Sequence, residues 1–425
     1  MSRTRISNSR DALIQSRGVA AEELRRHNLG TVVERLHLTG PTSRSDLVAG
    51  TGLNRSTIGD LIAELTDLGL VEESPGRATT GPGRPSPVVR TRPPGAVVLA
   101  IELSVDSVAV ATVGLGGHIY NQLRVARPRG HFSPEETVQD VAKLAEPLLA
   151  ALPTTHVLAG VGVAVVGVVR RSDGFVHLAP NLGWRDVPLG AMVGDGLRLT
   201  DRVLVANEAD LGALAEHRRG AGTGVNHLIY ISGEAGIGAG LIVDGKPMLG
   251  SAGYAGEAGH TVINPEGHRC RCGAVGCWEA EAGEAALARH AGIVASGTGL
   301  DIIDTVVARA KAGNGRTLDA LAEIGRWLGI GIGNLINVFN PELVVLGGSY
   351  QVLFPYLESA VVEGTRLQAL DAPGQLAKIT SSDLGPNAPL IGAAELALSG
   401  VIADPAGTAG HSVREGHAVD DRAGG

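Results

Sequence analysis

The cysteines and one histidine of this chain have the types and spacing of a metal site. All three cysteines, Cys270, Cys272 and Cys277, fall within eight consecutive positions, and His260 lies ten residues before the first of them. Three thiolates and one imidazole can complete the tetrahedral coordination of a structural Zn²⁺ ion. The alternative is three ordinary buried cysteines, but core cysteines would not gather in one short segment. The spacing therefore predicts a structural zinc site formed by His260, Cys270, Cys272 and Cys277.

Acidic residues and recognisable motifs surround this predicted metal site. Glu257 lies three residues before His260, and Glu279 lies two residues after the last cysteine. The stretches E-A-G-H, C-R-C-G-A-V-G-C and W-E resemble the E-x-G-H and C-x-C-G-x-x-G-C-x-E signatures of the ROK family, which groups repressors, open reading frames and sugar kinases. The resemblance extends from about residue 24 to about residue 398, which is nearly the whole chain.

The resemblance implies an α/β fold, in which a winged helix-turn-helix is followed by a two-lobed body of the actin-like, sugar-kinase type. We expect the chain to divide into a flexible N-terminus at 1–22, a DNA-binding domain at 23–92, a first lobe at 96–204 plus 380–400, a second lobe at 205–379 and a disordered tail at 403–425. The tail has no periodic hydrophobic residues that could join a core.

The resemblance also implies a sugar-binding site. Asn181 lies in a P-N-L-x-W loop, and Asn207 with Glu208 occupies the position of an N-D-A-N motif in ROK kinases. His260 is implied both as a metal ligand and as a sugar contact through its second ring nitrogen. The full implied set is Asn181, Asn207, Glu208, Glu257, His260 and Glu279. The alternative is that these polar side chains only satisfy one another.

The motifs that serve ATP in ROK kinases are altered in this chain. Asp106 lies in a hairpin turn that lacks the phosphate-binding glycines and threonine, and Glu234 replaces a glycine in the second phosphate loop, ISGEAGIGAG. Glu208 replaces the catalytic aspartate, which moves the carboxylate, and a shift of about 1 Å in a catalytic group can cost about 10²-fold in rate. We therefore expect neither ATP binding nor phosphoryl transfer.

Composition and charge indicate a globular protein. The 425 residues are 44% hydrophobic and 19% charged, and the apolar run 157–169 is too short to span a bilayer. The N-terminus lacks the apolar segment of a signal peptide, so we expect a cytoplasmic location, where thiolates are available to metals. Residues 1–90 carry 12 Arg, no Lys and 10 acidic residues, which is a net charge of +2. The whole chain has a net charge of −8, so the remaining residues carry −10. This slight basic surplus permits nucleic-acid binding.

The front of the chain has the pattern of a winged helix-turn-helix. An apolar stripe from Leu29 to Leu36 predicts a first helix, and a second short helix precedes the turn Thr51-Gly52-Leu53. Asn54 is suited to cap a third helix, the expected recognition helix. A Gly- and Pro-rich wing follows. The residues expected to contact DNA are Asn54, Arg55, Ser56, Thr57, Arg77 and Arg84. A three-helix bundle used for protein contacts is the alternative.

These observations predict a transcriptional regulator of carbohydrate genes, with repression as the expected sign. It would bind an inverted-repeat operator in double-stranded DNA as a homodimer or homotetramer and respond to a sugar or sugar phosphate. No membrane association is expected. Two alternatives stay open. One is an ATP-dependent sugar kinase with a DNA-binding head, in which Glu208 serves as base. The other is a DNA-binding protein whose body binds no sugar and only dimerises.

Overall fold

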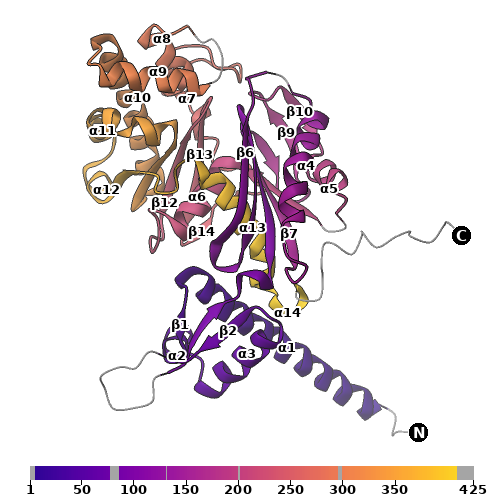
Figure 1. The fold of residues 1–425 in the computed structure, drawn as a ribbon. Helices are drawn as coiled ribbons and strands as arrows, with labels where there is room; N and C mark the ends of the chain where they lie inside the picture. Colours follow the sequence, from indigo (N-terminus) through magenta and orange to yellow (C-terminus); the bar gives the residue numbers. More distant parts are fainter. Residues whose placement is uncertain (1–4, 77–85, 131, 200–201, 295–298, 409–425) are drawn as a thin grey trace, which may run out of the picture.

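A computed structural model describes all residues except 1–4, 77–85, 131, 200–201, 295–298 and 409–425. The chain forms a small DNA-binding-type head and a larger body of two α/β lobes, with the head at one end of the body (Figure 1). Arg77 and Arg84, expected at the tip of the wing, lie outside the described residues.

The head contains three helices and a three-stranded sheet of order β1-β3-β2. Its elements are α1 (Arg5–Thr39), β1 (Thr42–Ser43), α2 (Arg44–Thr51), α3 (Arg55–Asp67), β2 (Val71–Ser74) and β3 (Val88–Thr91). Leu29 and Leu36 of α1 and Ile58 and Leu65 of α3 are almost fully buried, as the apolar stripes require. Antiparallel β2 and β3 form the base of the wing.

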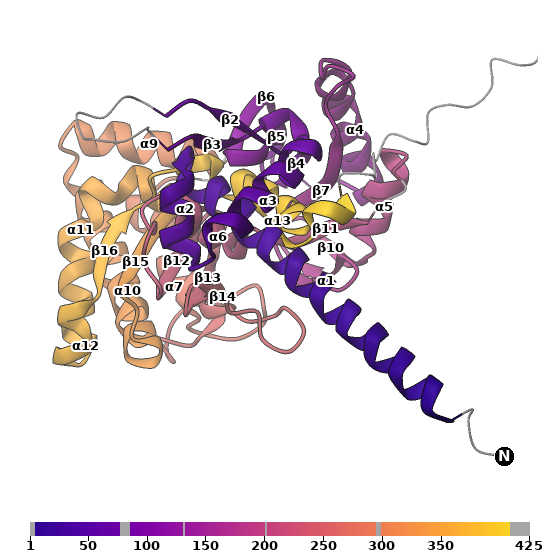
Figure 2. The ribbon, with the colours of Figure 1, turned by 90° about the horizontal axis from the view of Figure 1, so that it is seen from below.

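The first helix is longer than the sequence pattern indicated. It begins at Arg5, inside the range 1–22 that was expected to be flexible. Figures 1 and 2 both show the N-terminal half of α1 extending away from the rest of the protein. The stripe that identifies the helix starts only at Leu29, so the part of α1 before it carried no periodic signal.

The first lobe is built on a five-stranded sheet of order β11-β7-β4-β5-β6. Its strands are β4 (Val97–Leu103), β5 (Ser107–Gly114), β6 (His118–Ala126), β7 (Leu158–Val165) and β11 (Val203–Asn207). A small sheet and two helices complete it: β8 (Val168–Arg170), β9 (Phe175–Ala179), β10 (Trp184–Val187), α4 (Pro134–Ala150) and α5 (Leu189–Gly196). Because Asn207 pairs with Val165, this sheet continues past the boundary expected at 204.

The second lobe has a five-stranded sheet of order β14-β13-β12-β15-β16. Its strands are β12 (Leu228–Gly233), β13 (Ile237–Val243), β14 (Lys246–Pro247), β15 (Leu343–Gly348) and β16 (Lys378–Ser381). Its helices are α7 (Trp278–Ala282), α8 (Glu284–Ala291), α9 (Gly299–Lys311), α10 (Gly315–Phe339), α11 (Ser349–Gln368) and α12 (Asp371–Leu376). Ser381 pairs with Leu346, so the start of the range 380–400 belongs to this sheet and not to the first lobe.

Two helices, α6 (Glu208–Arg219) and α13 (Ala388–Ala403), pack against each other in the centre of the molecule (Figure 1). α6 also contacts β12 and β13 of the second lobe, whereas α13 contacts β4 and β7 of the first and α1 of the head. The segment 385–403 is apolar and long enough for a membrane span, but 61% of its most apolar window is buried inside the protein, as in a core helix. A short helix, α14 (Pro405–Thr408), follows within the range expected to be disordered.

The α6–α13 contact predicts a steric difference between two glycines of α13. A Cβ at Gly392 would lie 2.0 Å from the carbonyl oxygen of Leu211 in α6, whereas a Cβ at Gly400 would meet nothing within 4 Å. Gly392→Ala should lower the free energy of unfolding by about 1–3 kcal/mol through overpacking. Gly400→Ala, the matched control, should leave it unchanged or raise it by up to about 1 kcal/mol. Urea denaturation of both variants measures this, and equal effects would contradict the packing described.

Candidate functional site

The three cysteines and His260 converge on one point, in a loop between β14 and α7. Their ligand atoms all lie within 4.8 Å of one another. The Sγ atoms of Cys272 and Cys277 are 3.6 Å apart, and Sγ of Cys270 is 3.8 Å from Nδ1 of His260. A tetrahedral site with metal–sulfur bonds of about 2.3 Å has edges close to these lengths. The four residues therefore form a possible metal site with suitable donors and spacing.

The backbone of this loop can adopt its shape because of glycine. Gly276 has a φ of +75°, and a Cβ there would lie 1.6 Å from the carbonyl oxygen of Asn264. The loop then enters α7 at Trp278, which is fully buried and donates its indole N–H to the carbonyl oxygen of Trp327 at 3.1 Å. The core of the second lobe thus holds one end of the loop in place.

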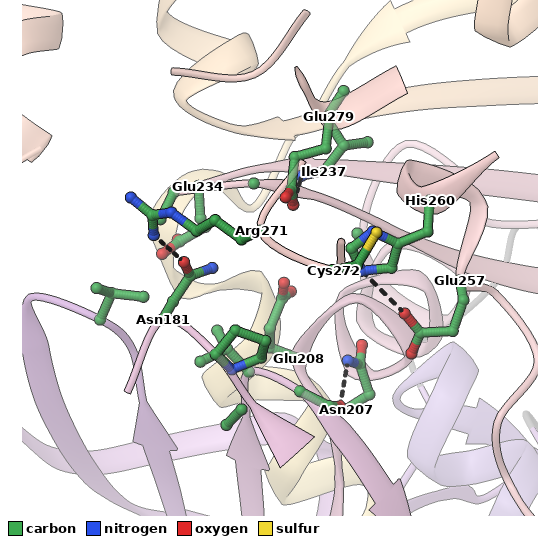
Figure 3. A pocket seen from close by; sticks show the side chains of 18 residues that line it. Asn181, Asn207, Glu208, Glu234, Ile237, Glu257, His260, Arg271, Cys272 and Glu279 are labelled. Atoms are coloured by element: carbon green, nitrogen blue, oxygen red, sulfur yellow. Dashed lines mark hydrogen bonds and ion pairs between the residues drawn. The ribbon is translucent and has the colours of Figure 1, made fainter. Parts of the chain in front are cut away.

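All six residues expected to contact a sugar line a single cavity between the lobes (Figure 3). The cavity and the open solvent at its mouth together hold about 680 Å³ of empty space. It lies beside the possible metal site, since His260 and Cys272 belong to its lining. Sugar binding by these residues stays a prediction.

Asn181 and Asn207 are already engaged in hydrogen bonds. The guanidinium of Arg271, from the metal loop, donates to Oδ1 of Asn181 in the first lobe, so this contact crosses the cavity (Figure 3). Oδ1 of Asn207 accepts from the backbone N–H of Ala209 at 2.8 Å and caps α6, while its Nδ2 donates to the carbonyl oxygen of Gly167 at 2.9 Å. Asn207 therefore positions the start of α6 with both of its polar groups.

His260 presents its two ring nitrogens in different directions. Nδ1 faces the sulfur of Cys270, and Nε2 lies 3.9 Å from a carboxylate oxygen of Glu257 on the cavity side. The ring geometry is thus compatible with one nitrogen on a metal and the other toward the cavity. Glu279 accepts a hydrogen bond from the backbone N–H of Ile237 at 3.3 Å, which ties the metal loop to β13.

Buried carboxyl groups concentrate around the first turn of α6. Burial, reinforced by the charge of Glu234, raises the pKa of Glu208 well above its ordinary value. Burial is also the main reason that the pKa of Asp210 rises to about 7. Oε2 of Glu208 is buried without a hydrogen-bond partner among the described residues. The carboxyl therefore has an unsatisfied oxygen at the edge of the cavity.

The region where ROK kinases hold phosphates contains a network of charged side chains. Ser104 donates to Glu234 at 2.7 Å, which joins the first lobe to the second. Arg129 forms a bidentate contact with Glu284 of α8, one bond of which is 2.8 Å long, and lies 3.6 Å from Asp106. A further pair, Arg124 with Glu102, is 2.8 Å apart. These contacts place carboxylates and arginines together between the lobes.

The expected DNA-contacting residues lie at the start of α3. Asn54 caps the helix, because its Oδ1 accepts from the backbone N–H of Thr57 at 2.9 Å, and Ser56 donates to the same oxygen at 2.7 Å. Arg55 is exposed and has no hydrogen-bond or ion-pair partner among the residues described. By contrast, Arg44 and Arg90 of the head pair with glutamates on β2.

Several residues of the site were not anticipated from the sequence. Arg271 sits between two cysteines and gave no signal of its own, although it reaches Asn181, 90 residues away. Arg124, Arg129 and Glu284 likewise meet partners that are distant in the chain. No local motif marks such pairs, so the sequence offered no means of finding them.

Glu234 should make stability depend on pH. Burial, followed by the nearby charge of Glu102, raises the pKa of Glu234 to about 7 from an ordinary 4.5, so the folded protein loses stability as pH rises between these values. Glu234→Gln removes this dependence. The free energy of unfolding of the variant, relative to wild type, should therefore increase from about pH 5 to about pH 8 in urea titrations. An exposed control, Glu358→Gln, should show no such trend, and a flat difference for Glu234→Gln would contradict the assignment.

Comparisons with known proteins agree with this architecture. Residues 98–399 match the sequence model of the ROK family. The chain is 30% identical to the xylose repressor of Caldicellulosiruptor bescii over 379 residues, covering 85% of this chain and 93% of the relative. It is also 30% identical to a glucokinase of Streptomyces coelicolor over 324 residues, covering 71% of this chain and 97% of the enzyme.

A solved structure extends the comparison to the head. The crystal structure of a ROK family transcriptional regulator, described as a homologue of the Escherichia coli MLC protein, superimposes with a TM-score of 0.73 at 26% identity. The match covers 90% of this chain and 97% of that regulator, whereas the glucokinase match covers only 71% of this chain. With its two lobes, its cysteine loop and its DNA-binding-type head, this chain belongs to the ROK family.

Proposed function

We propose that this protein is a DNA-binding transcriptional regulator of carbohydrate genes, with repression as the expected sign, controlled by a sugar bound between its lobes. The proposal rests on the presence of a winged helix-turn-helix and a polar cavity in the same chain. The chain also matches 93% of the length of a xylose repressor. The match to the xylose repressor covers 85% of this chain, whereas the match to the glucokinase covers 71%.

The cavity favours an uncharged sugar over a sugar phosphate. Its lining includes four carboxyl groups, Glu208, Glu234, Glu257 and Glu279, and its arginine, Arg271, is bonded to Asn181. Carboxyl groups accept or donate hydrogen bonds to hydroxyls, and Oε2 of Glu208 has no partner among the described residues to compete with such a bond. A phosphate dianion would have to lie among these four carboxyl groups, whose ionised forms repel it, which is unfavourable in a partly buried cavity.

The same groups disfavour phosphoryl transfer. Glu234 and Glu102 bring carboxylates to the region where a kinase stabilises phosphate charge, and Glu234 bonds Ser104 across the cleft. Glu208 has a longer side chain than the aspartate that ROK kinases carry at this position, which moves the carboxyl by ~1 Å, and a shift of that size in a catalytic group can cost about 10²-fold in rate. A kinase with a DNA-binding head is the alternative function, because the glucokinase of Streptomyces coelicolor matches this chain over nearly its full length.

Zinc is the metal we propose for the cysteine loop. Three thiolates and one imidazole at tetrahedral spacing suit Zn²⁺, and a full set of four protein donors is typical of structural sites. Such an ion would hold His260 and the loop that carries Glu257 and Glu279 at the cavity wall. We further propose a cytoplasmic homodimer or homotetramer that binds an inverted repeat, since paired recognition helices read paired half-sites.

Selection of genomic fragments tests the function. Purified protein is incubated with sheared genomic DNA of its source, and the retained fragments are sequenced, with and without D-xylose or D-glucose. We expect enrichment of a palindromic sequence beside carbohydrate genes and a change of that enrichment with one of the sugars. ADP release that depends on sugar and is abolished by Glu208→Gln, with no DNA enrichment, would instead favour the kinase.

A matched pair of arginine variants controls for nonspecific binding. Arg55→Ala removes an exposed, unpaired arginine at the start of the recognition helix, so it should weaken binding and reduce the salt dependence of binding by about one phosphate contact. Arg366→Ala removes an exposed arginine from α11 of the body and should leave DNA binding unchanged. Equal effects of the two changes would argue against the head as the DNA-binding surface.

Titration calorimetry tests the charge preference of the cavity. The affinities of D-xylose, D-glucose and D-glucose 6-phosphate are measured for the wild-type protein and for Glu234→Gln. We expect binding of a neutral sugar, no detectable binding of the phosphate to wild type, and improved tolerance of the phosphate in Glu234→Gln because one like charge is removed. Tight binding of the phosphate to wild type would contradict the preference.

Metal analysis tests the zinc site. Wild type should contain about one zinc per chain, and Cys272→Ser should lose it and unfold at a lower temperature, because a structural zinc contributes directly to folding. His268→Gln is the control, since this histidine lies in the same loop but bonds Glu281 and stands outside the cluster of four. Retention of zinc by Cys272→Ser, or loss of it from His268→Gln, would refute the ligand set.

A further inference from the structure

A buried carboxylate, Glu395 of α13, lies where the head meets the body. The residue is 1% exposed. It accepts hydrogen bonds from Nε2 of His37 in α1 at 2.9 Å, from Arg218 in α6 at 3.0 Å, and from Arg219 in α6. Burial alone would raise the pKa of Glu395, but the hydrogen bond from His37 and the charges of Arg219 and Arg218 hold it well below its usual range. The carboxylate therefore stays charged and joins three helices.

The contacts around His37 fix its orientation. The backbone N–H of Gly116, in the β5–β6 turn, donates to Nδ1 of His37 at 2.9 Å, which leaves Nε2 facing both the carboxylate of Glu395 and a guanidinium nitrogen of Arg219. Arg219 also donates to the carbonyl oxygen of Gly116 at 3.1 Å. The end of α6, the head helix α1 and the first-lobe sheet thus meet at Glu395, through hydrogen bonds that leave little freedom for any one of them.

The opposite end of α6 lies in the cavity. Asn207 caps the helix there, and Glu208, with its unpartnered oxygen, is the first helical residue. A helix of 12 residues spans roughly 18 Å, so α6 runs from the cavity to the head contact without interruption.

Close packing on two sides makes α6 move as one body. A Cβ at Gly240 of β13 would lie 2.2 Å from the carbonyl oxygen of Ala209, and one at Gly392 of α13 would lie 2.0 Å from that of Leu211. Leu211 and Leu214 of α6 also share one core cluster with apolar residues of α1 and α13. A displacement at Glu208 therefore cannot be absorbed within the helix.

We propose that α6 couples the cavity to the head, and that Glu395 is the positioning residue through which a shift of α6 reorients α1. This rests on the proposed function, since it describes how a sugar at that site reaches the DNA-binding surface. A sugar that bonds Glu208 differently in two arrangements of the lobes shifts their balance, and Arg218 and Arg219 transfer that shift to Glu395 and His37.

Glu395→Gln tests the coupling, because it keeps the shape of the side chain and removes its charge. The measured quantity is the ratio of the operator dissociation constants with and without sugar, using the fragment selected from the genome and D-xylose or D-glucose. Wild type should show a ratio of roughly 5 to 150, the range of ordinary allosteric coupling. In Glu395→Gln the ratio should fall below about 2, while calorimetry gives an unchanged sugar affinity.

Two further variants keep the test decisive. Arg219→Lys retains the charge but cannot bond Glu395 and Gly116 together, so it should reduce the ratio even where Glu395→Gln folds poorly. Glu216→Gln changes another buried carboxylate of α6, one that bonds Ser382 and not the head, and should keep the wild-type ratio. Hydrogen exchange adds a direct readout: sugar should alter exchange around residues 29–39 of α1 in wild type and not in Glu395→Gln.

The outcomes separate this inference from the proposed function. If neither sugar changes the operator dissociation constant of wild type, whether or not calorimetry shows that it binds, the proposed function is overturned and the coupling with it. A normal wild-type ratio that persists in Glu395→Gln and in Arg219→Lys would overturn the coupling alone and leave the regulator intact.

Discussion

The close packing of α6 against α13 is the constraint on which the rest of this structure depends. Backbone meets backbone at Gly392 and Leu211, where no side chain could intervene. α6 contacts the sheet of the second lobe, and α13 contacts the sheet of the first lobe and the head helix. Because interiors are packed to the density of crystals, a contact without free volume passes displacement on instead of absorbing it. Two lobes and a head are thereby joined through one helix pair.

The cavity between the lobes gathers carboxyl groups at a cost in desolvation. Arg124 offsets the desolvation cost of Glu102, and Ser104 offsets that of Glu234. Arg129 of the first lobe bonds Glu284 of the second. Glu208 lacks such a partner for one of its oxygens in the described residues. An unsatisfied buried oxygen costs free energy that a hydroxyl-bearing ligand would recover. This oxygen of Glu208 is therefore the group at which the proposed sugar would gain most from a hydrogen bond.

The cysteine loop forms one wall of this cavity and is held at both ends. Gly276 permits the close approach to Asn264, and Trp278 anchors the loop to α10. Arg271 of the loop and Glu279 of α7 both line the cavity. A metal bound by the four clustered ligands would provide the rigidity that apolar packing does not.

The sequence alone determined the features that depend on neighbours along the chain. The cysteine spacing, the cap at Asn54, the apolar stripes of α1 and α3, and the family motifs of the cavity are local patterns, and each predicted the element or cluster found. The limits of the lobes were less well predicted, because strand pairing, such as that of Asn207 with Val165, extends or reassigns elements whose own sequence looks unchanged.

Only the tertiary structure decided the contacts between residues far apart in the chain. His37 and Glu395 are 358 residues apart, and Arg271 meets Asn181 across the cleft. No periodicity or spacing relates such residues, because their approach depends on how whole helices and lobes pack. The sequence therefore specified the parts that form a possible metal site, line a cavity and cap α3. The packing of α6 between the two lobes determined how a cavity at one end of the protein is connected to a DNA-binding head at the other.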